Sequence, residues 1–164
     1  MLYNIEKMKE AIHYIIHQCG EKENVGKTVI YKLLYFSDFD YFELNEKSIT
    51  NETYQKYPQD PVPIHFEEIK NELITENKIT EEITQSYPGY SKYNYSSKTN
   101  PELKYLKKDE IERINKVINK LSNKTAREIS DYSHNDIPWR ATKDYNNIKY
   151  EFVFYRNEPY TVGE

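Results

Sequence analysis

VIYKLLYFSDFDYFEL (Val29–Leu44) is the stretch that decides how the rest of this chain folds. Plotted at about 100° per residue it is apolar or aromatic on nearly every side, whereas a surface helix keeps one polar face. It therefore predicts a central buried helix over about 26–45, wrapped by about four or five other helices. Asp38 falls at helical spacing between Leu34 and Phe42, so its carboxylate needs a hydrogen-bond or charge partner.

Amphipathic patterns place further helices on both sides of this stretch. Asn4 can cap a first helix, in which apolar residues recur at i, i+3 and i+4 as far as Cys19. A second pattern opens near Pro63, and a third covers about 108–121. The segment 46–63 has no helical period and contains three prolines, which predicts an ordered, turn-rich loop.

The second half of the chain mixes strand and helix signals. From about residue 79 the apolar period changes from 3.6 to 2, and a Pro-Gly turn follows, which predicts a small β-hairpin over about 79–98. Thr125 and Glu128 form a capping box that opens a short helix. The tail IKYEFVFY (148–155) alternates, which allows a C-terminal strand, although its apolar residues equally suit docking against the helices. The predicted fold class is α+β, mainly helical.

Length and composition limit the function classes. With 164 residues we expect one domain over 1–164, and the single cysteine excludes an internal disulfide. No segment has the apolar length of a signal peptide or a membrane span, so we expect a cytoplasmic protein without membrane contact. The net charge of −4 disfavours nucleic acid as a partner, whereas the 17 tyrosines favour protein interfaces.

Three patterns resemble ligand or catalytic sites but fail on spacing. GEKENVGKT (20–28) has five residues where a P-loop has four, and a predicted helix precedes it instead of a strand. His13 and His17 have metal-binding spacing, but we expect them on the solvent side of their helix, without a third ligand. Ser133 and His134 point about 100° apart on a helix, so they are no obvious nucleophile–base pair. We expect no cofactor and no metal.

The hairpin sequence YPGYSKYNYSSK leaves two functions open. Its tyrosines, Tyr87, Tyr90 and Tyr93, could stack on single-stranded bases while its lysines contact phosphates. The hairpin could equally be amphipathic and present one face to a protein partner. Because the chain is acidic, protein binding is the leading hypothesis, and a nucleic-acid-binding regulator that uses this hairpin is the alternative.

Three clusters remain that these patterns do not explain: KLLYFSD (32–38), SITNETYQKYPQDPVP (48–63) and AREISDYSHNDIPW (126–139). His134 ends a short predicted helix, where the helix dipole favours a histidine. A sharper hypothesis is that His134 or a neighbouring hydroxyl binds Asp38 across the core and fastens the C-terminal part to the central helix. A hydrolase working through the same two residues would need them in one open pocket.

Together the clusters resemble the Panacea domain of SocA-like antitoxins. That family shows K-L-L-Y-hydrophobic-x-D on an early helix, then I-T-G-x-x-Y and G-P-V-P in a loop, then L-S-x-x-(S/T)-H before a Trp. Order and spacing agree over roughly Lys32–Thr142. The matching positions include Lys32, Tyr35, Asp38, Thr50, Tyr54, Pro61, Val62, Pro63, Ser133, His134 and Trp139.

Two positions depart from the family pattern. Asn51 stands where glycine is usual, and asparagine tolerates the left-handed backbone well. Asp60 stands where glycine precedes Pro-Val-Pro, which leaves the geometry of that turn open. The resemblance implies a non-enzymatic antitoxin of a toxin–antitoxin or phage-defence system, of host or prophage origin. Its partner would be a cognate toxin encoded next door, and in at least one type a protease complex receives that toxin.

Overall fold

The structure is a computed structural model that describes residues 3–87 and 89–163, with Ser86 and Tyr87 described by their backbone alone. In chain order the elements are α1 (Ile5–Cys19), α2 (Lys27–Asn45), β1 (Tyr54–Lys56), β2 (Pro61–Pro63), α3 (Phe66–Thr75), β3 (Ile79–Tyr87), β4 (Tyr90–Ser97), α4 (Lys108–Leu121), α5 (Ala126–His134), α6 (Ile137–Arg140) and the 3-10 helix η1 (Tyr150–Tyr155).

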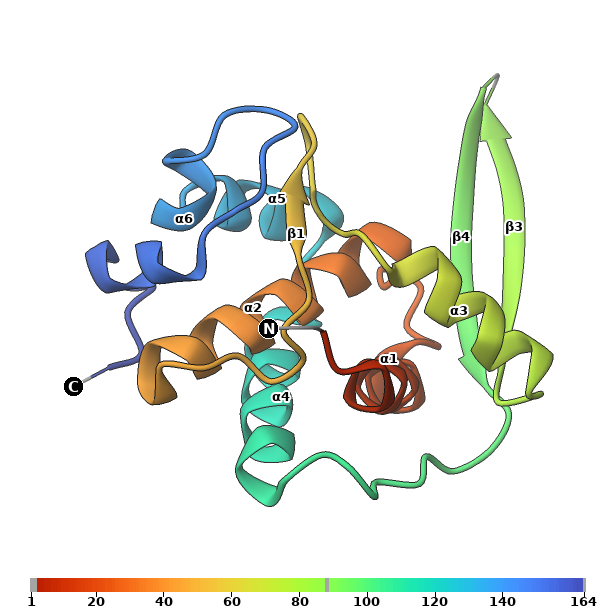
Figure 1. The fold of residues 1–164 in the computed structure, drawn as a ribbon. Helices are drawn as coiled ribbons and strands as arrows, with labels where there is room; N and C mark the ends of the chain where they lie inside the picture. The colour runs from red at the N-terminus through yellow and green to blue at the C-terminus, as the bar shows by residue number, and fades with distance from the viewer. Residues whose placement is uncertain (1–2, 88, 164) are drawn as a thin grey trace.

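Helix α2 runs through the middle of the molecule, with α1, α4, α5 and η1 around it (Figure 1). Every residue from Val29 to Tyr41 is buried, which confirms the predicted central helix. One continuous apolar core extends from Met8 on α1 to Val153 on η1. Within the described residues, no helix is long and apolar enough to cross a membrane.

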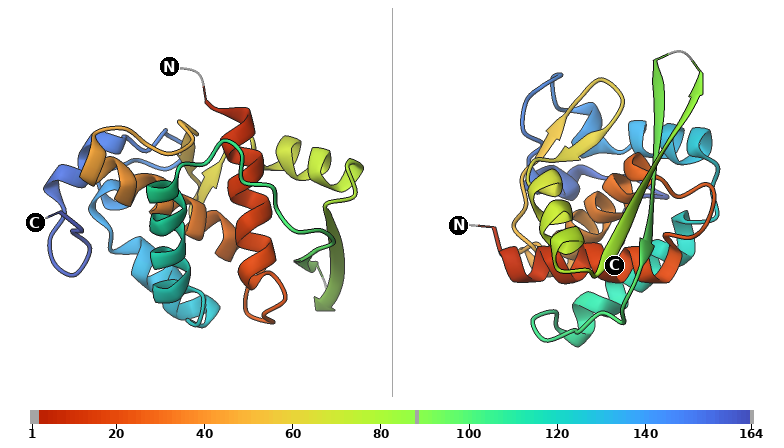
Figure 2. Two further views of the ribbon diagram at one scale, coloured as in Figure 1. Left: turned by 90° about the horizontal axis from the view of Figure 1, so that it is seen from below. Right: turned by 90° about the vertical axis from the view of Figure 1, so that its right-hand side faces the viewer.

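Two small antiparallel sheets lie at the edge of this helical body. The predicted hairpin is confirmed as β3 paired with β4, from Ile79 opposite Ser97 outward. It projects away from the helices, as Figure 2 shows, and only its base is covered, where Tyr95 is buried. The second sheet, β1 with β2, lies in the segment predicted as a loop, and the two prolines of β2 hide any strand pattern there.

The C-terminal tail forms the 3-10 helix η1, so the option of a C-terminal strand is wrong and docking against the helices is correct. Tyr150 stacks on Phe39 of α2 with ring centroids 4.3 Å apart, and Val153 is buried. These two residues are three apart, and a 3-10 turn places such residues on the same side. Aromatic packing against α2 therefore decides the conformation that the alternating sequence left open.

Candidate functional site

Three polar side chains at intervals of three residues along α2 each bind a different later segment of the chain. Lys32 binds the turn before β2, Tyr35 binds the start of α6, and Asp38 binds the loop between α2 and β1. Residues three apart are neighbours on a helix surface, so one side of α2 gathers all three segments. The KLLYFSD cluster thus acts as a frame for the other two clusters.

Asp38 is 1 % exposed and accepts four hydrogen bonds. Its Oδ1 accepts the backbone N–H groups of Ile49 and Thr50 at 3.0 and 2.9 Å. Its Oδ2 accepts the hydroxyls of Thr50 and Tyr54, each at 2.6 Å. Burial raises the pKa of Asp38 to about 6, and the bonds from Thr50 and Tyr54 oppose that rise. The predicted need for a partner is confirmed, but the prediction that His134 or a neighbouring hydroxyl supplies it is wrong.

The loop that Asp38 holds has a second buried carboxylate. Glu52 is fully buried and accepts the backbone N–H of His65 at 2.9 Å, while its other oxygen lies 2.6 Å from His65 Nδ1. Asn51 has a φ of 60°, which is the left-handed conformation that its family counterpart, a glycine, would adopt. The backbone N–H of Asn51 donates to Ser48 Oγ at 2.9 Å. Asparagine in place of glycine is therefore accommodated here.

Asp60, the other departure from the family pattern, is the partner of Lys32. The Lys32 side chain is 3 % exposed, and its Nζ lies 2.8 Å from Asp60 Oδ1. The turn closes through the backbone N–H of Tyr57, which donates to the carbonyl of Asp60 at 3.0 Å. Asp60 is not among the positive-φ residues, so this turn needs no glycine. The aspartate instead supplies a charge for a lysine that the core almost covers.

The Lys32–Asp60 pair gives a testable prediction for stability. Asp60→Asn is expected to lower the free energy of unfolding by about 1.5–3 kcal/mol, because it weakens a hydrogen bond to a nearly buried charge. In the double variant Lys32→Met with Asp60→Asn, most of that loss should be recovered, since no unpaired charge remains. Urea unfolding of the four proteins of this cycle measures the coupling, and strictly additive losses would contradict it.

The third cluster (126–139) also binds the 48–63 loop. His134 Nε2 lies 2.8 Å from the carbonyl oxygen of Gln59, and its ring stacks on Trp139 at 4.9 Å. Lys56 Nζ donates to the carbonyl of Trp139 at 3.0 Å. Ser133 is fully buried, and its hydroxyl donates to the carbonyl of Ser130 at 2.9 Å. The cluster thus anchors the turn.

His134 and Asp38 bind different segments, so the open pocket that the hydrolase hypothesis requires is not formed by these two residues. Asp38 directs its four hydrogen bonds to residues 49–54, and the His134 ring contacts Gln59 and Trp139.

A buried ion cluster around Arg156 was missed by sequence analysis. The Arg156 side chain is 0 % exposed, and its Nε and Nη2 donate to the two carboxylate oxygens of Asp136 at 2.9 and 2.8 Å. Its Nη1 donates to Asp40 of α2 at 2.8 Å. Tyr35 donates to the same Asp136 at 2.9 Å. Burial raises the pKa of Asp40 to about 6, against the opposing charge of Arg156. The available signal was an arginine directly after the aromatic tail, for which docking against the helices was one of the two alternatives.

The frame positions one wall of an apolar cleft of about 420 Å³ between the hairpin and the start of α2. The turn side contributes Tyr57 and Val62, and β4 contributes Tyr90 and Tyr93. Tyr90 is 64 % exposed, although it is a large aromatic side chain. The cleft thus brings together the 48–63 loop and the hairpin tyrosines. The side chain of Tyr87, predicted with them, lies outside the described residues.

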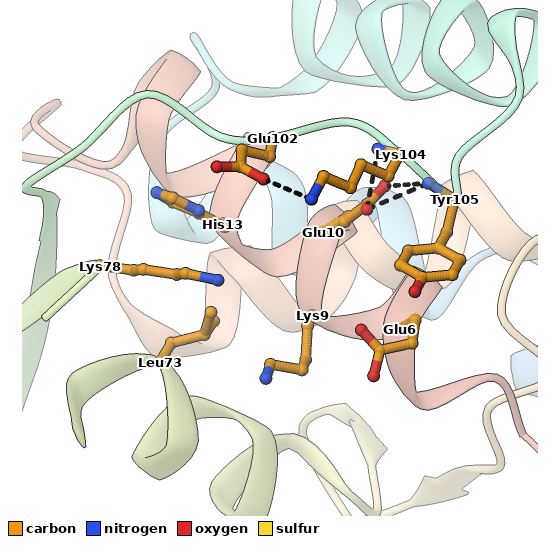
Figure 3. Close-up of a pocket in the computed structure, with 9 residues that line it drawn as sticks. All are labelled: Glu6, Lys9, Glu10, His13, Leu73, Lys78, Glu102, Lys104 and Tyr105. Carbon is orange, nitrogen blue, oxygen red and sulfur yellow. Dashed lines mark hydrogen bonds and ion pairs between the residues drawn. The ribbon is translucent and has the colours of Figure 1, made fainter. Parts of the chain in front are cut away.

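A smaller cavity of about 190 Å³ lies between α1, the end of α3 and the segment before α4 (Figure 3). The Glu10 carboxylate there accepts the backbone N–H groups of Lys104 and Tyr105, the latter at 3.0 Å, and so ties that segment to α1. His13 is buried, not on the solvent side as predicted, and its Nε2 lies 3.0 Å from the carbonyl of Thr99. Two of the charged groups that line this cavity already bind other parts of the chain: Glu10 holds the segment before α4, and Lys9 Nζ lies 2.7 Å from Glu76.

His13 and His17 do not form a metal site in this arrangement. Both rings contact Ser97 Oγ, at 3.2 and 3.1 Å, and burial lowers the pKa of His13. Among residues 3–87 and 89–163, no three His, Cys, Asp or Glu side chains are grouped so that they could hold a metal ion.

Comparison with known families matches the chain to one of them. The family model described as antitoxin SocA-like, Panacea domain, covers residues 30–140. This range runs from α2 to α6 and contains all three clusters, whereas α1 and η1 lie outside it. No curated protein and no solved structure gives a significant match. The chain belongs to the SocA-like antitoxin family and carries its Panacea domain.

Proposed function

We propose that this chain is an antitoxin that neutralises a cognate toxin by direct binding, and that the cleft between β4 and the turn at 57–62 belongs to the binding surface. The observation that supports this is the contrast between buried and exposed residues. Asp38, Thr50 and Tyr54 are buried in the frame, whereas Tyr57 and Tyr90 stand exposed at the rim of an apolar cleft. Exposed tyrosines around an apolar cleft are typical of protein-binding sites.

The chemistry of the surface favours a protein over nucleic acid. The net charge of −4 opposes attraction to a phosphate backbone, and it favours encounter with a basic toxin. The cleft lysine Lys27 is already paired with Glu67 at 2.6 Å and lies over the Tyr93 ring at 3.9 Å. We place the toxin gene next to the gene for this chain. Delivery of the bound toxin to a protease is a second outcome that the same complex would permit.

Co-purification tests this proposal directly. The tagged chain is expressed with the product of the adjacent gene, and the affinity of the complex is measured by calorimetry at 50 and 500 mM salt. A complex with an apolar core should change affinity only modestly over this range. Nucleic-acid binding would weaken steeply, because each phosphate contact releases counterions. Absence of a complex, together with steeply salt-dependent binding to single-stranded DNA or RNA, would overturn the antitoxin proposal.

Tyr90→Ala is expected to weaken toxin binding by about 10- to 30-fold without changing the melting temperature. Exposed tyrosines that become buried at an interface often contribute a large share of the binding energy. The side chain is 64 % exposed, so its removal costs the free protein little. Tyr155→Ala is the matched control, because Tyr155 is 71 % exposed but lies on η1, away from the hairpin (Figure 1). Unchanged binding by Tyr90→Ala would place the interface elsewhere, and an equal loss for Tyr155→Ala would show that the effect is not specific to the cleft.

A further inference from the structure

Among the residues that the structure describes, the outer edge of β4 is paired only at its inner end. Gly26 forms an antiparallel bridge with Asn94, so the chain entering α2 lies beside β4 as a third strand would. A Cβ added at Gly26 would lie 3.0 Å from the carbonyl oxygen of Tyr93, and one at Gly20 would lie 2.9 Å from that of Tyr95. The carbonyls of Tyr93 and Tyr95 therefore point away from β3 and toward the body.

The geometry of an antiparallel strand shows which other residues of β4 face this outer edge. The N–H and C=O groups of one residue point to the same side of an antiparallel strand, and alternate residues share a side. Ser91 therefore directs its backbone N–H and C=O to the same outer edge as Tyr93. The chain leaves that edge at Lys27, where α2 begins. In the part of the chain that the structure describes, no backbone group outside the hairpin hydrogen-bonds to Ser91.

This free edge lines the apolar cleft. Ser91 and Tyr93 are part of its wall, and Tyr31, Tyr57 and Val62 also line it. An unpaired strand edge beside apolar side chains offers backbone hydrogen bonds and side-chain pockets to one extended segment. Next to this free part of the edge, Gly26 already pairs with Asn94, which shows that an antiparallel neighbour fits against β4.

We propose that an extended segment of the cognate toxin adds to the Ser91–Tyr93 edge of β4 as a strand and places alternate apolar side chains against Tyr31, Tyr57 and Val62. The inference rests on the proposed antitoxin function and specifies how the toxin docks. The required chemistry is a short extended stretch with apolar residues at every second position and backbone N–H and C=O groups at the paired positions.

Ser91→Pro is the variant that tests this docking mode. Proline removes the outward N–H of Ser91 without removing a donor from the ladder with β3. Gln85→Pro is the matched control, because Gln85 is the register partner of Ser91 and, in the regular ladder that ends at this pair, points its N–H to the opposite edge of the hairpin. The register shift between Gln85 and Tyr87 lies beyond this pair, toward the turn. Both variants lose the hydrogen bond from Gln85 Nε2 to Ser91 Oγ, which is 2.9 Å long. The probe is the product of the adjacent gene.

Ser91→Pro should weaken binding of that protein at least about tenfold, and Gln85→Pro should leave it within about twofold, with equal melting temperatures. In the wild-type complex, hydrogen exchange of the Ser91 amide should slow markedly relative to the free protein. Retained binding by Ser91→Pro, or an unprotected Ser91 amide in a wild-type complex, would overturn strand addition and leave the antitoxin proposal intact. Absence of any wild-type complex would overturn both, and dimers of this chain through β4 would assign the edge to a second copy.

Discussion

Asp38→Ala is expected to lower the free energy of unfolding by about 4 kcal/mol or more. The change leaves the backbone N–H groups of Ile49 and Thr50 and the hydroxyls of Thr50 and Tyr54 without their acceptor. Each buried donor left unsatisfied costs about 1–3 kcal/mol, and these four share one site, so their costs are not independent. Urea unfolding followed by circular dichroism measures the loss. A variant with unchanged unfolding and full neutralisation would remove Asp38 from the frame.

Asp38→Asn is the control, and its milder effect should depend on pH. The folded pKa of Asp38 is raised to about 6, above the ordinary value of an exposed aspartate. The folded protein therefore binds an extra proton between about pH 4 and 6, so this group contributes stability below about pH 4 that is lost as the pH rises through 6. The wild type should thus gain stability relative to Asp38→Asn on acidification from pH 7 to pH 4.

Arg156→Met is expected to destabilise the fold by about 3–5 kcal/mol, since it removes one partner of a buried ion cluster. The bidentate bonds to Asp136 and the bond to Asp40 are lost, and Glu43, whose Oε1 lies 3.2 Å from Nη1, also loses its cation. The carboxylates would remain buried without a neutralising charge. Thermal and urea unfolding at pH 7 measure the effect.

Arg113→Met is the matched control for this cluster. Arg113 is an arginine that faces the same Asp40, but at 3.9 Å, and its side chain is partly exposed. Partly exposed pairs contribute about 1 kcal/mol or less. We therefore expect Arg113→Met to cost far less than Arg156→Met. Equal costs would show that the Arg156 cluster does not hold the C-terminal part on α2.

The elements with a clear pattern of apolar residues could be predicted from the sequence. The central helix is apolar on all sides, and the Lys108–Leu121 helix has one apolar stripe, so both were placed to within a residue or two. The hairpin followed from its period of 2. The tail could not be decided, because Tyr150 and Val153 satisfy a 3-10 spacing within an alternating sequence. Its conformation depends on packing against Phe39 and Phe42, which local sequence does not show.

The same limit applies to the site. The position of Asp38 among apolar residues predicted a hydrogen-bond or charge partner for its carboxylate. Its partners Thr50 and Tyr54, however, belong to a loop whose path only the fold determines. Arg156 and Asp40 are separated by 116 positions, and no local pattern pairs them. The cleft could be anticipated only as two separate segments, the loop and the hairpin. Their meeting point depends on how Asp38 and Lys32 hold the loop on α2.

Substitutions in the frame and substitutions in the cleft are therefore expected to have different effects. Substitutions at Asp38 or Arg156 should act on folding, whereas Tyr90→Ala and Ser91→Pro should act on binding and leave folding unchanged. Most positions that match the family pattern are buried, whereas Tyr57 and Tyr90, which line the cleft, do not belong to that pattern; Val62 matches the pattern and also lines the cleft. If the cleft binds the toxin as proposed, substitutions there should change partner choice while the frame is kept.

A growth assay tests the central claim most directly. The adjacent gene is expressed alone, then together with wild-type chain, and then together with the Tyr90→Ala variant, in cells monitored for growth. We predict that the adjacent gene product arrests growth, that the wild type restores it, and that Tyr90→Ala restores it less well at equal expression. Harmless expression of the adjacent gene, or arrest that the wild type does not relieve, would contradict the account.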